Sequence, residues 1–190
     1  VQTCALPIWP LAEAPPRAAP AAAVAPAGPR QDLLRLQQRR ALLTDAARPE
    51  AMARRHASGL RSARENVTDL LDAGTLVEYG AFAVAAQRSR RSLDDLQRNT
   101  PADGLITATG CVDSRPVAVL AYDYTVLAGT QGMNNHAKSD RLLDLAARQR
   151  LPIVWFMEGG GGRPGDVDSP KVAGLHCTTF GQFAALSGVV

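Results

Sequence analysis

The sequence has few cysteines, almost no lysine and no long apolar run. Its three cysteines, Cys4, Cys111 and Cys177, form no CxxC pair and have no metal-ligand spacing. This excludes a disulfide framework and a zinc module, so we expect no metal and a reducing, cytoplasmic setting. No run of about 18 apolar residues is available to span a membrane, and no signal peptide is evident. We therefore expect no membrane partner.

The positive charge comes almost entirely from arginine. Lys138 and Lys171 are the only lysines among 21 basic residues, and the net charge is +3. The arginines lie in mixed-charge segments without an RNA-binding signature, so no nucleic-acid partner is predicted.

The chain divides into three parts, and its 190 residues leave room for one domain. Residues 1–8, VQTCALPI, match the translation of a common sequencing adapter, and we interpret them as an artefact outside the fold. Residues 9–30 are mostly Ala and Pro, which predicts an extended linker after a preceding domain. Residues 31–190 are expected to hold the domain. Its apolar, helix-like end at residues 179–187 carries no turn signal, so we expect a truncated domain.

Helices are predicted at the start of this domain. Apolar residues have helical spacing across residues 31–57, with Thr44-Asp45 as a possible N-cap for a second piece and Pro49 in its first turn. A further helix is predicted from Ser62, which forms a capping box with Glu65, to Leu71.

The following segments predict an α/β layer. A strand at residues 75–79 precedes an arginine-rich loop that ends near Thr100. The later elements are a β-hairpin of residues 104–112 and 116–124, a helix at 141–150, and an apolar run at 152–157. That run is typical of a strand buried on both faces.

Glu158 to Gly165, EGGGGRPG, follows this strand directly and precedes a predicted helical segment. Glycines let backbone N–H groups approach a ligand oxygen closely, and one such donor stabilises a developing oxyanion by roughly 3 to 4 kcal/mol. A flexible loop remains the alternative on this segment alone.

Tyr122 to Lys138, YDYTVLAGTQGMNNHAK, carries a strand end into the loop AGTQG and then into a helix. The first turn of a helix favours anions, so His136 and Lys138 are candidates to meet phosphate or carboxylate groups. A tight turn with solvated basic residues is the alternative.

Three segments, TPADGLITATG, AYDYTVLAGTQGMNNHAKSDRLLDLA and LPIVWFMEGGGGRPGD, together resemble the N-terminal half of the CoA carboxyltransferase family. This family is the transferase component of biotin-dependent acyl-CoA carboxylases. The resemblance implies an α/β, crotonase-like fold of β-β-α units in a superhelix, here incomplete and preceded by N-terminal helices. It also implies carboxyl transfer from carboxybiotin to the α-carbon of an acyl-CoA, of the acetyl-CoA or propionyl-CoA carboxylase type, through an enolate held by backbone N–H groups.

Site residues follow from the same resemblance. The glycine pair Gly160 and Gly161 is expected to form the oxyanion hole for the acyl thioester. The AGTQG turn is expected to contact CoA through Ala128, Gly129, Thr130, Gln131 and Gly132. No side-chain base is required, so no catalytic role is expected for His56, His136 or His176.

The resemblance further implies cofactors and partners. Biotin would arrive as carboxybiotin on a carrier domain, with biotin carboxyl carrier and biotin carboxylase domains as partners and a homo-oligomer formed through the transferase halves. Many family members have Asp-Ser-Gly-Gly-Ala-Arg where this chain has residues 158–163, EGGGGR. The variant resembles carboxylases that carry all three functions on one chain.

Two other functions remain open. The first is a crotonase-fold hydratase or decarboxylase acting on a CoA thioester, since the same oxyanion chemistry serves both. A hydratase would be expected to place acidic residues beside the oxyanion hole, and Glu158 is the only nearby carboxylate before Asp166. The second is a non-catalytic scaffold domain of a carboxylase complex, because the family builds its site from two halves. We expect this fragment to be inactive alone.

Overall fold

The computed structural model describes residues 28–168 and 178–189. The predictions for residues 1–8, for most of the linker and for His176 and Cys177 lie outside the described residues. The helices are α1 (Gln31–Ala41), α2 (Pro49–Ala57), α3 (Ala63–Leu70), α4 (Leu93–Asn99), α5 (Met133–Gln149) and α6 (Thr179–Leu186), with short 3-10 turns η1 (Asp45–Ala47), η2 (Pro101–Gly104) and η3 (Leu127–Gly129). The strands are β1 (Val77–Tyr79), β2 (Leu105–Val112), β3 (Arg115–Tyr122) and β4 (Ile153–Phe156). Among these helices none combines the length and apolar character needed to cross a membrane.

One sheet with strand order β1-β2-β3-β4 organises the described residues. The first three strands pair antiparallel, whereas β4 pairs parallel to β3 after the chain crosses over through α5. The predicted hairpin of β2 and β3 is confirmed, with a turn at Asp113 and Ser114. Both turn residues have positive φ, at 49° and 64°, which suits the right-handed twist of a tight hairpin. The side chain of Asp72 fixes this turn by accepting from both backbone N–H groups, at 3.1 and 2.7 Å.

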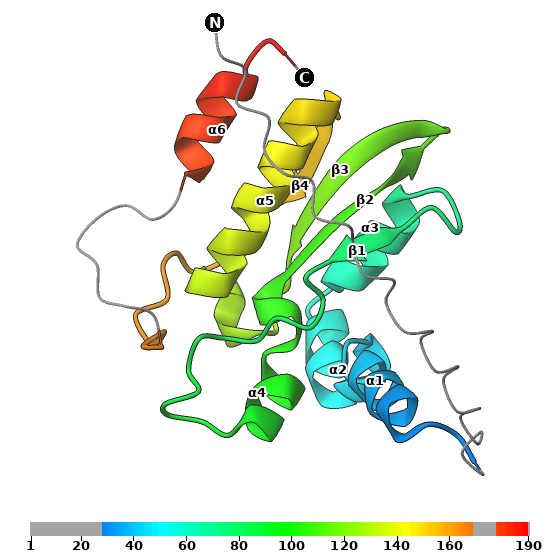
Figure 1. Cartoon of the computed structure of the whole chain (residues 1–190), viewed down its shortest axis with the longest axis vertical. Coiled ribbons are helices and arrows are strands. Elements are labelled where there is room, and N and C mark those ends of the chain that lie inside the picture. The colour runs from blue at the N-terminus through cyan, green and yellow to red at the C-terminus, as the bar shows by residue number, and fades with distance from the viewer. Residues whose placement is uncertain (1–27, 169–177, 190) are drawn as a thin grey trace, which may run out of the picture.

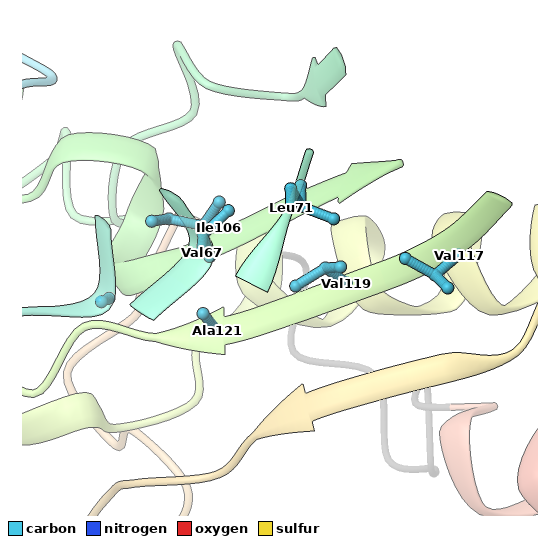
Figure 2. Packing of buried hydrophobic residues seen from close by; sticks show 7 residues of the cluster. Val67, Leu71, Ile106, Val117, Val119 and Ala121 are labelled. Carbon is cyan, nitrogen blue, oxygen red and sulfur yellow. The ribbon is translucent and has the colours of Figure 1, made fainter. Parts of the chain in front are cut away.

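The two faces of the sheet bury separate apolar clusters, because side chains alternate along each strand. On one face, α3 packs Val67 and Leu71 against Ile106, Val119 and neighbouring strand residues (Figure 2). On the other face, α5 covers the second cluster (Figure 1), whose buried members are Leu105, Ala118, Leu120, Tyr122, Leu142, Ala146 and Leu151. The sheet therefore lies between helices, as the α/β prediction requires.

The N-terminal helices follow the capping signals in part. Both hydrogen bonds of the predicted capping box form, since Glu65 N–H donates to Ser62 Oγ at 3.0 Å and Ser62 N–H donates to the Glu65 carboxylate at 2.7 Å. Pro49 is the first residue of α2, as predicted. Thr44 occupies the N-cap position of η1, as predicted, but its hydroxyl donates to Ala41 O, so the capping hydrogen bond does not form.

Three sequence predictions need correction. The supposed loop before Thr100 contains α4, which begins where Ser92 Oγ accepts from Asp95 N–H at 3.2 Å, and which buries Leu96 completely. Helix α5 begins at Met133, directly after the AGTQG turn as that segment predicted, so the bounds 141–150 drawn from the apolar pattern were too short. Strand β4 is half-buried, not buried on both faces, because it is the last strand of the described sheet.

The end of the described chain returns to α5. No helix follows the glycine loop within residues 163–168, but α6 forms where the sequence predicted apolar helix. The Asp140 carboxylate on α5 accepts from Thr178 N–H at 3.1 Å and Thr179 Oγ1 at 2.7 Å. Phe183 stacks on Trp155 of β4 with ring centroids 5.2 Å apart. These contacts fix α6 beside α5 (Figure 1).

Candidate functional site

Two loops meet at one edge of the sheet. Residues 123–132 follow β3 and include the AGTQG turn, and residues 157–168 follow β4 and include the glycine run. Because β3 and β4 are parallel neighbours, their carboxyl ends open at the same edge. In α/β sheets this edge is where ligands bind. The fold therefore brings together the two segments that the sequence singled out.

Backbone hydrogen bonds join the two loops. Gly160 N–H donates to Ala128 O at 3.1 Å, Gln131 N–H donates to Gly161 O at 2.8 Å, and Arg163 N–H donates to Gln131 O at 2.7 Å. The join depends on close backbone approach, since a Cβ at Gly159 would lie only 2.2 Å from Gly129 O. No other residue type fits that position without moving one loop.

The N–H groups of the predicted oxyanion pair differ. Gly160 N–H is engaged by Ala128 O. Gly161 N–H has no acceptor within the described residues, and its φ of +86° belongs to the region that favours glycine. No atom lies within 4 Å of the point where a Cβ of Gly161 would sit. The open donor is therefore that of Gly161, and a role for Gly160 N–H stays a prediction that requires its bond to Ala128 to open.

The N-terminus of α5 binds carboxylates, as anions are expected to bind there, but they belong to the chain itself. Met133 N–H donates to Asp166 Oδ2 at 3.0 Å, and Asn135 N–H donates to Asp103 Oδ2 at 2.8 Å. Lys138 does not face an external anion. Its ammonium is buried and donates to the Ala102 and Leu105 carbonyl oxygens, and burial lowers its pKa to about 8. The prediction that Lys138 meets a phosphate was wrong.

A buried charged cluster lies under the two loops. Arg163, whose side chain is 4% exposed, pairs with Asp103 at 2.5 Å and more loosely with Asp166 at 3.5 Å. Burial raises the pKa of Asp103, and the Arg163 charge opposes that rise. Sequence reasoning missed Asp103 because it lies 60 residues before Arg163, and it missed Asp166, an i,i+3 neighbour of Arg163, because nothing in the local pattern marks that carboxylate as buried. The one local signal for Asp103 is its position between Pro101 and the apolar start of β2.

A second ion pair fixes the start of the glycine loop. Both guanidinium N–H₂ groups of Arg55 on α2 donate to the Glu158 carboxylate, at 3.0 and 2.5 Å. The hydrogen bond to Glu158 raises the pKa of Arg55. This bidentate geometry is the strong form of an arginine-carboxylate contact.

A cavity of about 510 Å³ borders the glycine loop at Met157 and Glu158. Strands β3 and β4 contribute Tyr122, Trp155 and Phe156 to its wall. The rest of the wall comes from α2, α3 and the segment between them, through Arg55, Gly59, Leu60, Arg61 and Asn66. Apolar strand residues and two arginines thus line one hollow beside the open end of β4.

Two histidines lie within the described residues, apart from the glycine loop. His56 contacts Glu65 at 3.0 Å in an exposed pair, and His136 lies in the first turns of α5. Within residues 28–168 and 178–189, no group of three His, Cys, Asp or Glu side chains is arranged to hold a metal ion.

Comparison with known proteins assigns the chain to a family. The family model of the carboxyl transferase domain matches residues 54–188, so the chain belongs to the carboxyl transferase family. It is 34% identical over 146 residues to the propionyl-CoA carboxylase beta chain of Saccharopolyspora erythraea, covering 76% of this chain and 26% of that protein. It is 33% identical over 133 residues to the methylmalonyl-CoA decarboxylase subunit alpha of Propionigenium modestum, covering 70% of this chain and 25% of that protein.

A solved structure agrees with the family. A single-chain, multi-domain long-chain acyl-CoA carboxylase is 55% identical, with a TM-score of 0.77, over 84% of this chain and 16% of that one. The α/β, crotonase-like fold class is thereby confirmed. The chain spans about a quarter of the length of the curated relatives named above.

Proposed function

We propose that residues 31–190 form the N-terminal half of a carboxyltransferase site that adds a carboxyl group to the α-carbon of an acyl-CoA. The observation that carries this proposal is the open N–H group of Gly161 at the carboxyl end of β4, in a loop without side chains between residues 159 and 162. Membership of the carboxyl transferase family supports the same reaction.

In this proposal the chain binds the thioester and stabilises its enolate. Loss of a proton from the α-carbon places negative charge on the thioester oxygen, and Gly161 N–H donates to that oxygen. A fixed donor of this kind contributes roughly 3 to 4 kcal/mol in the transition state. Carboxybiotin would release the carboxyl carbon by cleavage of its N–C bond, and the ureido nitrogen freed in this way would accept the α-proton. The enolate carbon would then form the new C–C bond to the released carboxyl carbon.

The residues near the loop fit a CoA thioester. The turn from Ala128 to Gly132 borders the glycine loop and is proposed to contact CoA. The cavity beside Glu158 offers apolar walls, which suit an apolar acyl chain. Biotin carboxylase and biotin carrier domains would complete the enzyme as partners, together with the second transferase half.

The carboxylates beside the loop favour carboxyl transfer over hydration. A hydratase needs acidic groups free to exchange protons with substrate. Glu158 is held bidentately by Arg55, and Asp166 accepts from Met133 N–H and pairs with Arg163. Both carboxylates are thus occupied by partners of the chain itself.

The test is carboxylation of acetyl-, propionyl- and long-chain acyl-CoA by a complete carboxylase that contains this segment, with the biotin carboxylase and carrier present. We expect carboxylation of acetyl-CoA or propionyl-CoA, and no turnover by the 190-residue chain alone. Preference for the long-chain substrate would overturn the proposed acyl class only. Hydration or decarboxylation without biotin would favour the crotonase-type alternative, and a folded complex without any turnover would favour the scaffold.

A further inference from the structure

Three charged side chains are buried beneath the glycine loop. Asp103 is fully buried, and the side chains of Arg163 and Asp166 are 4% and 2% exposed. They come from separate places, since Asp103 lies in η2 before β2, whereas Arg163 and Asp166 follow the glycine run. Burying charge is costly unless every group is paired, so the arrangement of partners is constrained.

Arg163 bridges the two loops through its planar fork. Its NH2 group donates to Thr130 O at 2.6 Å, and its Nε–H donates to Thr130 Oγ1 at 3.2 Å. Its NH1 group donates to Asp103 at 2.5 Å. One side chain therefore connects the AGTQG turn, η2 and its own loop, a geometry that the point charge of lysine cannot reproduce.

The α5 N-terminus balances the remaining charge. Two carboxylates face one guanidinium. Asp166 also accepts from Met133 N–H at 3.0 Å and from Gln87 Nε2 at 3.2 Å, while Asn135 N–H donates to Asp103 at 2.8 Å. The packing leaves little room, because a Cβ at Gly132 would lie 2.2 Å from Asp166 Oδ2. The cluster thus fixes the glycine loop against the N-terminus of α5 and leaves no space for a larger side chain at Gly132.

We propose that Arg163 is a positioning residue, which holds the glycine loop against the AGTQG turn so that Gly161 N–H stays directed at the reacting oxygen. The effect of Arg163 on catalysis rests on the proposed function, in which Gly161 N–H binds the enolate oxygen. In this proposal Arg163 does not contact the substrate. It acts through Thr130 and through its own N–H bond to Gln131, next to the bond from Gln131 to Gly161 O.

The first test measures hydrogen exchange in the 190-residue chain. In Arg163→Lys, the hydrogen-bonded amides of the two loops should exchange at least about tenfold faster, while those of β2 and β3 keep their protection; the loop amides are those of Thr130, Gln131, Gly160 and Arg163. Asp166→Asn, of almost unchanged shape, should give the same local pattern if Arg163→Lys folds poorly. The matched control is Arg64→Lys, which alters a partly buried arginine paired with Glu78 of β1. Unchanged loop exchange, or faster exchange spread evenly over the sheet, would overturn the inference.

The second test separates kcat from KM in a complete carboxylase that contains this segment. A donor misplaced by about 1 Å costs roughly a hundredfold in rate. Arg163→Lys should therefore lower kcat by about 10- to 100-fold with KM for the acyl-CoA within about threefold, Arg163→Met should lower kcat further, and Arg64→Lys should leave kcat unchanged. Faster loop exchange with unchanged kcat would overturn the positioning role. A wild-type enzyme without turnover would instead remove the proposed function while the exchange result stands.

Discussion

Gly159→Ala should force the two loops apart and destabilise the whole domain. The added Cβ would lie 2.2 Å from Gly129 O, whereas ordinary contact requires more than about 3.2 Å. The loops must therefore separate by about 1 Å, which stretches hydrogen bonds that now measure 2.7 to 3.1 Å. Overpacking of this kind costs about 1 to 3 kcal/mol, and each lost hydrogen bond about 1 kcal/mol more. We expect the free energy of unfolding to fall by about 2 to 4 kcal/mol.

The matched control is Gly162→Ala in the same loop. Nothing lies within 4 Å of its added Cβ, and its φ is outside the glycine-favouring region, so we expect a change within about 0.5 kcal/mol. Urea denaturation of both variants, followed by circular dichroism, gives the two midpoints at constant slope. Equal midpoints would refute the close-approach reasoning.

Three further variants test other contacts. Ser62→Ala removes the capping box of α3 and should lower the free energy of unfolding by about 1 kcal/mol in urea denaturation; no change would show that the cap contributes nothing. Arg55→Met leaves Glu158 without its bidentate partner and should lower the free energy of unfolding by about 1 to 3 kcal/mol. The loss is smaller than for a fully buried pair because the Glu158 side chain is 36% exposed. A double-mutant cycle with Glu158→Gln should show positive coupling between the two side chains. Lys138→Met tests the buried ammonium. The pKa of Lys138 is about 8 in the folded state and 10.5 ordinarily, so between these pH values the unfolded state binds more protons than the folded state. The free energy of unfolding of the wild type therefore rises with pH in this range. The wild-type advantage over Lys138→Met should therefore grow by up to about 3 kcal/mol from pH 8 to pH 10.5, and a flat difference would contradict the assigned burial.

Local signals in the sequence predicted much of the fold. The capping box at Ser62, the proline at the start of α2, and the β2-β3 hairpin depend on contacts between near neighbours, which a sequence pattern reports directly. Helix α4 was missed because arginines and polar residues conceal a short helix whose one fully buried apolar side chain is Leu96. The half-buried state of β4 depends on its place in the sheet, which no local pattern specifies.

The candidate site was predicted as two segments but not as a set of contacts. Parallel strands bring the AGTQG turn and the glycine run together, in line with the family resemblance. The sequence could not show that Gly160 N–H bonds to Ala128 O, nor that the anions at the α5 N-terminus are Asp103 and Asp166. These contacts join residues distant in the chain, so only the folded geometry distinguishes an engaged donor from an open one.

The most direct measurement replaces the amide of Gly161 by an ester in a complete carboxylase that contains this segment, using glycolic acid at that position. The change deletes one N–H group and adds no bulk. The proposed oxyanion role predicts a kcat lower by about 10²- to 10³-fold with KM nearly unchanged. The same replacement at Gly160 should mainly weaken the bond to Ala128 and lower stability by about 1 kcal/mol. Unchanged kcat for the Gly161 ester would contradict the role of its N–H group in catalysis.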